Sequence, residues 1–244
     1  MRRWLFNQHV GAPRLTFKGF FIRLLVVLLA WILLYQLWIF LHICWWIKFN
    51  PTSSAFMEDR LAIIQEKNPE AELKHKWVNY TQISNNLKRA VIASEDAKFI
   101  DHEGVDWEAI QVAYEKNLKK GKIVSGGSTI SQQLAKNLFL SSKRTPWRKA
   151  QELVITYMLE AMLDKRRIFE IYLNIIEWGD GVFGAEAASR HYFKTSAAKL
   201  STQQAARLAV MIPNPRFYDK HKKTNYLAKR TAVIQARMRF AEIP

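Results

Sequence analysis

The residue whose type and place most strongly suggest chemistry is Glu95. Steps of four along this stretch give Ile83, Leu87, Val91, Glu95 and Phe99, which share one face if the stretch is helical. A carboxylate on an apolar face loses hydration, which raises its pKa and suits it to exchange a proton near neutral pH. The pattern fits equally well a helix end where Glu95 and its neighbour emerge into solvent, so both interpretations stay open.

A second cluster runs from Ser128 to Asn137 with the sequence STISQQLAKN. Backbone N–H groups at a helix start, the hydroxyls of Ser128 and Thr129, and the ammonium of Lys136 could together hold a phosphate. Gln133 and Asn137 are four residues apart and could bind sugar hydroxyls from one helix face. A solvated face behind a good N-cap explains the same residues, and without further context it is the better explanation.

A third cluster, Arg148, Lys149 and Glu152, falls in the first turns of another predicted helix. The helix dipole favours an acidic residue there, so Glu152 could be purely structural. Two cations beside it indicate a site that meets a charged ligand. This cluster alone is a weak signal.

The elements that must position these clusters are predicted to be helices, because few runs alternate with period two. Ser128 or Thr129 would cap a helix that buries Ile130, Leu134 and Leu138. Thr145 and Pro146 suit the N-cap and first position of the next helix. The residues of that helix at core spacing are Trp147, Ala150, Val154, Tyr157, Met158 and Ala161.

Two further helices are predicted toward the C-terminus. One carries Ile168, Tyr172 and Ile175 and stops near residues 179–181. The other opens with a capping box of Ser201 and Gln204. It is ended by the prolines at positions 213 and 215.

An apolar segment precedes all of these elements. Residues 24–41 carry no charge, and the apolar run continues to residue 47. This length is enough for a transmembrane helix, with Trp38, Trp45 and Trp46 as an interfacial belt. A cleaved signal peptide is the alternative, but its apolar region would span only ~7–15 residues and end in small ones. The run here ends in Trp-Trp-Ile-Lys, which favours a retained anchor.

Basic residues ahead of the segment set its orientation: Arg2, Arg3, Arg14, Lys18 and Arg23. By the positive-inside rule the N-terminus stays in the cytoplasm and the rest is exported. The predicted organisation is a basic cytoplasmic segment (1–23), a transmembrane helix (24–47), a linker (48–60) and one all-α, mainly helical domain (61–244).

Charge and cysteine content limit the partners. The net charge of +16 implies an anionic partner (nucleic acid, anionic lipid or a phosphorylated substrate), with plain solubility as the alternative. Export of the domain disfavours nucleic acid and favours the membrane and lipid phosphate. Cys44 is the only cysteine, which excludes an internal disulfide and a zinc site built on cysteine pairs.

Taken together, five ordered motifs resemble those of the peptidoglycan glycosyltransferase family, and in particular its monofunctional members. They cover the region from about residue 80 to residue 218. The motifs are SEDAKFIDHEG (94–104), GGSTISQQLAKNLFL (126–140), RKAQE (148–152), RIFEIYLN (167–174) and LAVMIPN (208–214).

This resemblance implies a lysozyme-like fold in two lobes around a cleft, with lipid II as substrate and undecaprenyl pyrophosphate as leaving group. Glu95 falls on the general base that activates the acceptor's sugar 4-hydroxyl. Glu152 falls on a second essential glutamate that assists at the pyrophosphate, directly or through a divalent cation, Mg²⁺ or Mn²⁺; no organic cofactor is implied. The residues implied to support Glu95 or to bind substrate are Asp96, Phe99, His102, Ser128, Thr129, Gln133, Lys136, Asn137, Arg148 and Lys149.

The implied setting is the bacterial inner membrane, crossed once, with the catalytic domain on the periplasmic side. Besides lipid II and the growing glycan strand, penicillin-binding and divisome proteins are candidate partners.

Two features depart from the family's pattern. Bifunctional members carry an acidic residue after the Asn of the fourth motif, where this chain has Ile175; the nearby Glu177 receives no role. Ser196 and Lys199 match the S-x-x-K pattern of transpeptidases, but no K-T-G follows, so no transpeptidase domain is expected.

Two alternatives to a glycan polymerase remain. A glycan-cleaving hydrolase or lytic transglycosylase would need an acidic pair across a sugar-binding cleft. A membrane-tethered scaffold for cell-wall enzymes would need no catalytic site.

Overall fold

The computed structural model describes residues 17–122, 126–141 and 145–244, in two compact units that divide after His42. Arg2, Arg3 and Arg14, which carry much of the predicted orientation signal, lie outside the described residues.

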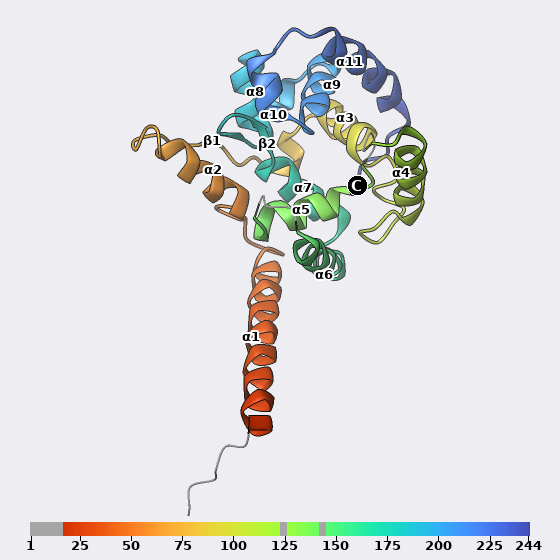
Figure 1. The fold of residues 1–244 in the computed structure, drawn as a ribbon. Helices are drawn as coiled ribbons and strands as arrows, with labels where there is room; N and C mark the ends of the chain where they lie inside the picture. The colour runs from red at the N-terminus through yellow and green to blue at the C-terminus, as the bar shows by residue number, and fades with distance from the viewer. Residues whose placement is uncertain (1–16, 123–125, 142–144) are drawn as a thin grey trace, which may run out of the picture. The chain divides into compact units, whose positions relative to one another are not determined.

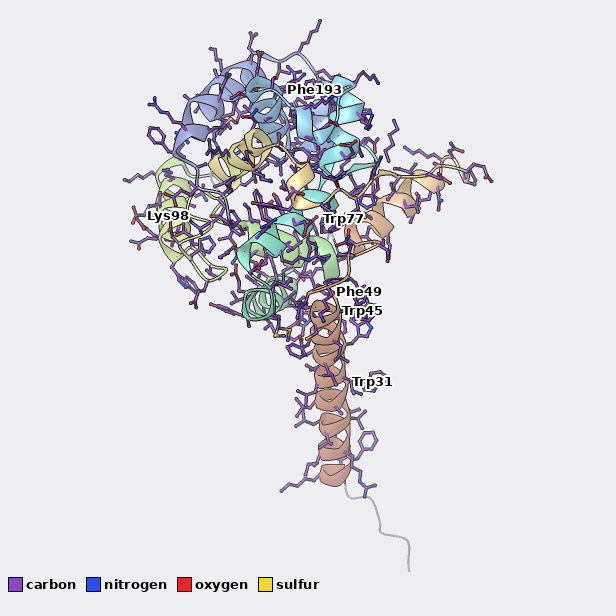
Figure 2. All side chains as sticks on the ribbon, turned by 180° about the vertical axis from the view of Figure 1, so that it is seen from behind. Trp31, Trp45, Phe49, Trp77, Lys98 and Phe193 are labelled. Carbon is purple, nitrogen blue, oxygen red and sulfur yellow. The ribbon has the colours of Figure 1, made fainter. Side chains whose placement is uncertain are left out.

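The first unit contains most of helix α1 (Phe17–Trp45), which has 29 residues. At 1.5 Å per residue it is about 44 Å long, and its most apolar window has a mean hydropathy of 2.5. Almost none of that window is buried, and Trp31 projects from the helix with 68% of its surface exposed (Figure 2). Helix α1 is therefore long and apolar enough to cross a membrane.

The second unit is mainly helical, which confirms the predicted fold class (Figure 1). Its first helices are α2 (Ala55–Gln65), α3 (Asn85–Glu95), α4 (Trp107–Lys120), α5 (Ile130–Phe139) and α6 (Pro146–Met162). The later ones are α7 (Lys165–Ile175), α8 (Ala185–Phe193), α9 (Thr202–Met211), α10 (Pro215–Lys220) and α11 (Asn225–Arg237).

Two groups of helices form the core of this unit. Helix α3 packs against α9, and α9 packs against α11; α5 packs against both α6 and α7. The apolar positions predicted on the Glu95 stripe are buried, although only Leu87 and Val91 lie inside α3, because Ile83 precedes the helix and Phe99 follows it. Ile130, Leu134 and Leu138 are buried on α5, as predicted.

Three predicted helix starts are confirmed. Thr129 caps α5 and forms a capping box with Gln132. Thr145 caps α6, with Pro146 in the first turn, and Ser201 caps α9 in a box with Gln204. In each case the side-chain oxygen accepts a hydrogen bond from a backbone N–H that the helix leaves unpaired.

A small sheet was not predicted. It contains β1 (Lys74–His75), β2 (Glu177–Gly179) and β3 (Val182–Phe183) in the order β1-β3-β2. β1 is parallel to β3, with Lys74 opposite Val182, and β2 is antiparallel to β3. Strands of two or three residues are too short to show an alternating pattern, so sequence periodicity does not reveal them.

The prediction for the inner face of α6 was wrong. Trp147, Ala150, Val154, Tyr157 and Ala161 are exposed and Met158 is half-buried. The buried positions of α6 are Gln151, Glu152, Ile155, Thr156 and Leu159. Periodicity shows which residues share a face, but it does not show that the apolar face is the inner one; here three polar residues lie on the buried face.

Gly104 occupies a place that no other residue fits well. Its φ is +85°, and a Cβ would lie 2.7 Å from Cγ2 of Thr156 and 2.9 Å from Cγ of Glu160 on α6. Gly121, which ends α4, also has a positive φ of +60°, yet among the described residues a Cβ there meets no atom within 4 Å.

We expect Gly104→Ala to lower the free energy of unfolding by roughly 2–4 kcal/mol, since left-handed backbone and steric overlap both contribute. Gly121→Ala, the matched control, should lose only about 1–2 kcal/mol because its cost is conformational alone. Urea denaturation of the detergent-solubilised chain, followed by tryptophan fluorescence, measures both. Equal losses would contradict the close approach at Gly104.

Candidate active site

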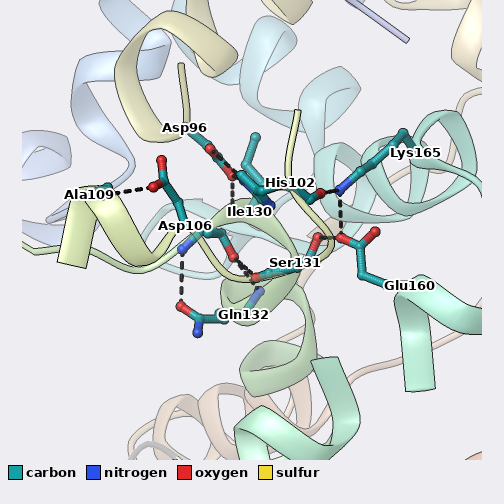
Figure 3. Close-up of polar contacts among 11 residues, drawn as sticks. Asp96, His102, Asp106, Ala109, Ile130, Ser131, Gln132, Glu160 and Lys165 are labelled. Atoms are coloured by element: carbon teal, nitrogen blue, oxygen red, sulfur yellow. Dashed lines mark hydrogen bonds and ion pairs between the residues drawn. The ribbon is translucent and has the colours of Figure 1, made fainter. Parts of the chain in front are cut away.

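The carboxylate of Asp96 joins the end of α3 to the start of α5. Its Oδ2 accepts a hydrogen bond from the backbone N–H of Ile130 at 2.9 Å, and both oxygens lie 3.1 Å from Nε2 of His102 (Figure 3). Asp96 itself is buried, so it does not emerge into solvent as one interpretation of the sequence had it. The first and second motifs are thereby held together.

Glu95, the last residue of α3, is half-buried and hydrogen-bonded through both oxygens. Oγ of Ser94 donates to Oε1 at 3.2 Å, and Nε2 of Gln133 donates to Oε2 at 3.0 Å. The Oε1 of Gln133 in turn accepts from the hydroxyl of Tyr172 at 3.0 Å. Burial raises the pKa of Glu95, while these hydrogen bonds and the nearby charge of Lys136 act in the opposite direction.

Phe99 and His102, on the segment after α3, support the site from within the protein and line neither the larger nor the smaller cavity. The Phe99 ring is fully buried and packs on Phe169 at 5.5 Å between centroids. Lys165 lies 4.8 Å from the centre of the Phe99 ring and donates to the backbone carbonyl of His102. Glu160 accepts from Lys165 at 2.8 Å and from Ser131. The segment after α3 that carries Phe99 and His102 is thereby tied to α5, α6 and α7 (Figure 3).

A cavity of about 500 Å³ lies beside Gln133. One wall comes from α5, the residue before its N-cap, and α6. The other comes from the residue after α7, the start of β2, the α9–α10 connection and the first turn of α10, with Phe56 of α2 added. The first wall contains Ser128, Gln132, Gln133, Lys136, Asn137, Arg148, Lys149 and Glu152, and the second contains Ile176, Glu177, Ile212, Pro213, Pro215 and Arg216.

Glu152 is buried at the edge of this cavity and paired with two cations. Nη1 of Arg148 lies 2.9 Å from its Oε2, and Nζ of Lys149 contacts its Oε1. Glu152 is thus part of a charged site. It also lies in the second turn of α6, close enough to the N-terminus for the helix dipole to stabilise its charge, which was the structural alternative. Lys136 lies 5.3 Å from the centre of the Phe56 ring, and the Asn137 amide donates to the carbonyl of Gln133 at 2.7 Å.

A second cavity, of about 260 Å³, contains Glu95 itself. Asp96, Thr129 and the first turn of α4 also line it, and Ser128 lines both cavities. The predicted residues therefore fall into three places: Glu95, Asp96 and Thr129 around the second cavity, the cations and amides around the first, and Phe99 and His102 behind.

The sequence had not indicated several of these residues. Tyr172 was predicted only as a core residue, although a buried tyrosine hydroxyl needs a partner; burial and then the charge of Glu95 raise its pKa well above the usual value. Phe56 and Arg216 were missed because nothing in their local sequence sets them apart. Glu177 was noted without a role, and it lines the larger cavity.

Comparison with known proteins identifies the family. A family model described as Transglycosylase matches residues 61–239. The chain is 66% identical to a biosynthetic peptidoglycan transglycosylase of Methylobacillus flagellatus over 93% of this chain and 99% of that protein. It is 64% identical to proteins of the same name in Chromobacterium violaceum and Laribacter hongkongensis, over 91% of this chain and 97% and 98% of theirs. With a family model covering more than half its length and relatives matching nearly all of it, this chain belongs to the transglycosylase family, the glycosyltransferases of peptidoglycan synthesis.

Proposed function

We propose that the chain polymerises lipid II into β-1,4-linked glycan strands and releases undecaprenyl pyrophosphate, with Glu95 as general base. The observation that carries this proposal is the juxtaposition of two sites through Gln133 and Ser128. A half-buried carboxylate with a raised pKa lies in one cavity, and a cation-lined cavity large enough for a sugar phosphate adjoins it.

Glu95 suits the role of base because its surroundings fix its position and raise its affinity for a proton. Ser94 and Gln133 hold both carboxylate oxygens in place. An acceptor sugar bound in the smaller cavity would present its 4-hydroxyl to this carboxylate, which takes the proton as the hydroxyl oxygen attacks the donor's anomeric carbon.

The larger cavity suits the departing pyrophosphate. Lys136, Arg148 and Lys149 supply three positive charges against the single charge of Glu152, so that wall keeps an excess of two. Negative charge grows on the leaving oxygen as the glycosidic bond breaks, and fixed cations there stabilise that transition state.

The divalent cation stays a prediction, and the residues of the cavity do not form a ready site for it. Arg148 and Lys149 already occupy both oxygens of Glu152, and Glu177 lies between Arg60 and Arg216. The described part of the chain holds no group of three potential metal ligands. No step proposed here passes through a metal.

We place the enzyme in the bacterial inner membrane, with α1 as a single-pass anchor and the second unit on the periplasmic side. The length and apolar character of α1 support the anchor. Penicillin-binding and divisome proteins are the partners that would supply cross-linking. Incubation of the purified protein with labelled lipid II tests the activity: polymer supports the proposal, whereas cleavage of preformed glycan, or no reaction, supports the hydrolase or the scaffold.

We expect Glu95→Gln to lower kcat for lipid II polymerisation by at least ~10²-fold, the usual contribution of a positioned base. Because the base works only when ionised and its pKa is raised, wild-type kcat/KM should fall as the pH drops through a value above 4.5. The variant should lack this acidic limb. Glu115→Gln, on the exposed surface of α4, is the control. A variant that keeps a tenth of wild-type turnover would refute the assignment.

The same substitution should raise the melting temperature at neutral pH. Burial raises the folded-state pKa of Glu95, so its stabilising contribution is complete below the unfolded value and is lost as pH rises through the folded value. The gain of Glu95→Gln should therefore shrink as the pH approaches 4. Differential scanning calorimetry at both pH values measures it, and an unchanged gain would indicate that the carboxylate is not desolvated.

Lys136→Ala and Lys149→Ala should each weaken binding of lipid II by about 1.5–3 kcal/mol, because charge-assisted bonds to phosphate are lost. Binding of finished glycan, which lacks pyrophosphate, should change much less. Lys116→Ala, on the exposed surface of α4, controls for the lost charge. Equal losses for the two ligands would point to a general electrostatic effect.

A further inference from the structure

The two walls of the larger cavity differ in how their charges are arranged. On the α5–α6 wall, Arg148 and Lys149 are paired directly with Glu152. On the other wall the charged residues are Glu177 and Arg216, and their contact is looser. Neither of these two residues has a role in the mechanism proposed above.

Arg216, in the first turn of α10, has donors to offer to a ligand. Its side chain is 55% exposed, and its Nε lies 3.7 Å from Oε2 of Glu177. This separation exceeds the usual 2.7–3.2 Å of an N–H···O hydrogen bond, so the carboxylate attracts the guanidinium without using its N–H groups. The guanidinium donates no hydrogen bond to any other residue in the described ranges.

Glu177 is more deeply buried than its partner. Its side chain is only 12% exposed, and its Oε1 lies 3.7 Å from Nε of Arg60. Arg60 is itself paired with Asp180, the residue directly after β2. The buried carboxylate thus lies between the guanidiniums of Arg60 and Arg216, and its charge attracts Arg216 toward the cavity wall.

Helix α10 is held to the end of β2 by a separate polar cluster around Asp219. Oδ1 of Asp219 accepts hydrogen bonds from the Tyr192 hydroxyl at 3.0 Å and from His191 at 2.9 Å. Its Oδ2 accepts from the backbone N–H of Asp180 at 3.2 Å. Because α10 and β2 are joined in this way, Arg216 and Glu177 keep their relative positions at the cavity wall.

We propose that Arg216, oriented by Glu177, is a further phosphate-binding residue, which contacts the pyrophosphate of the lipid-linked substrate from the second wall. A guanidinium presents a planar set of donors that matches phosphate oxygens. Lys136, Arg148 and Lys149 would then hold the phosphate from one wall and Arg216 from the other. This inference rests on the proposed function for the identity of the ligand.

Titration of the detergent-solubilised full-length chain with farnesyl pyrophosphate, which carries no sugar or peptide, tests the site, with farnesol as the neutral control ligand. Arg216→Ala should weaken farnesyl pyrophosphate binding about tenfold, the loss of one charge-assisted contact. Arg216→Lys keeps the charge without the planar donors and should lose about threefold. Lys220→Ala, at the exposed end of the same helix, should leave affinity unchanged, and no variant should alter farnesol binding.

Wild-type affinity in Arg216→Ala would overturn the proposal, as would a wild-type chain that does not prefer farnesyl pyrophosphate to farnesol. A raised KM for lipid II with normal farnesyl pyrophosphate binding would also overturn it, because Arg216 would then contact another acidic group of the substrate. Failure of the proposed function looks different: the chain would bind farnesyl pyrophosphate through Arg216 and yet make no polymer.

The orienting role of Glu177 has its own measurement. Glu177→Gln should weaken farnesyl pyrophosphate binding about threefold in the wild-type background, because Arg216 is no longer held at the cavity. In the Arg216→Ala background the same change should not weaken binding further. An equal loss in both backgrounds would show that Glu177 acts independently of Arg216.

Discussion

The bond between the Asp96 carboxylate and the first backbone N–H of α5 is the contact on which the site depends. A carboxylate at a helix N-terminus satisfies an unpaired donor and meets the positive end of the helix dipole. Here it also fixes the angular position of α5 relative to the end of α3. Gln133 is three residues further along α5, so the same contact brings its amide to Glu95. Glu95 and the cation-bearing helices thus share one reference point.

From that point the charges separate into two regions. The smaller cavity receives the raised-pKa carboxylate, and the larger one receives the excess of cations. Tyr172 and Gln133 form a neutral hydrogen-bonded partition between α7 and Glu95. Glu95 is thereby hydrogen-bonded to a neutral amide, whereas direct pairing with a cation would lower its pKa further. A carboxylate with a raised pKa and a cation-lined cavity thus lie side by side.

The sequence predicted the parts of this arrangement that depend on local patterns. The caps at Thr129, Thr145 and Ser201 follow from side-chain chemistry within four residues, and the buried stripe of α5 follows from its period. The burial of Glu152 depends on how the helices pack. Glu177 pairs with Arg60, which lies more than a hundred residues away in the sequence. No local signal encodes either feature. The prediction for the inner face of α6 was wrong for a related reason. A helix that borders a charged cavity needs polar residues there, whereas hydrophobicity alone predicts an apolar inner face.

The polar inner face and apolar outer face of α6 have a practical consequence. Helix α6 contributes Glu152 to the cavity from its inner face, while Trp147, Val154 and Tyr157 form an apolar outer surface. The two faces are separated by about 10 Å, the diameter of one helix. A detergent micelle that covers the outer surface therefore contacts the same helix that lines the cation-bearing cavity. Turnover measured in detergents of different head group and chain length would then report on the micelle as well as on the enzyme, and rates from different preparations are comparable only in one detergent.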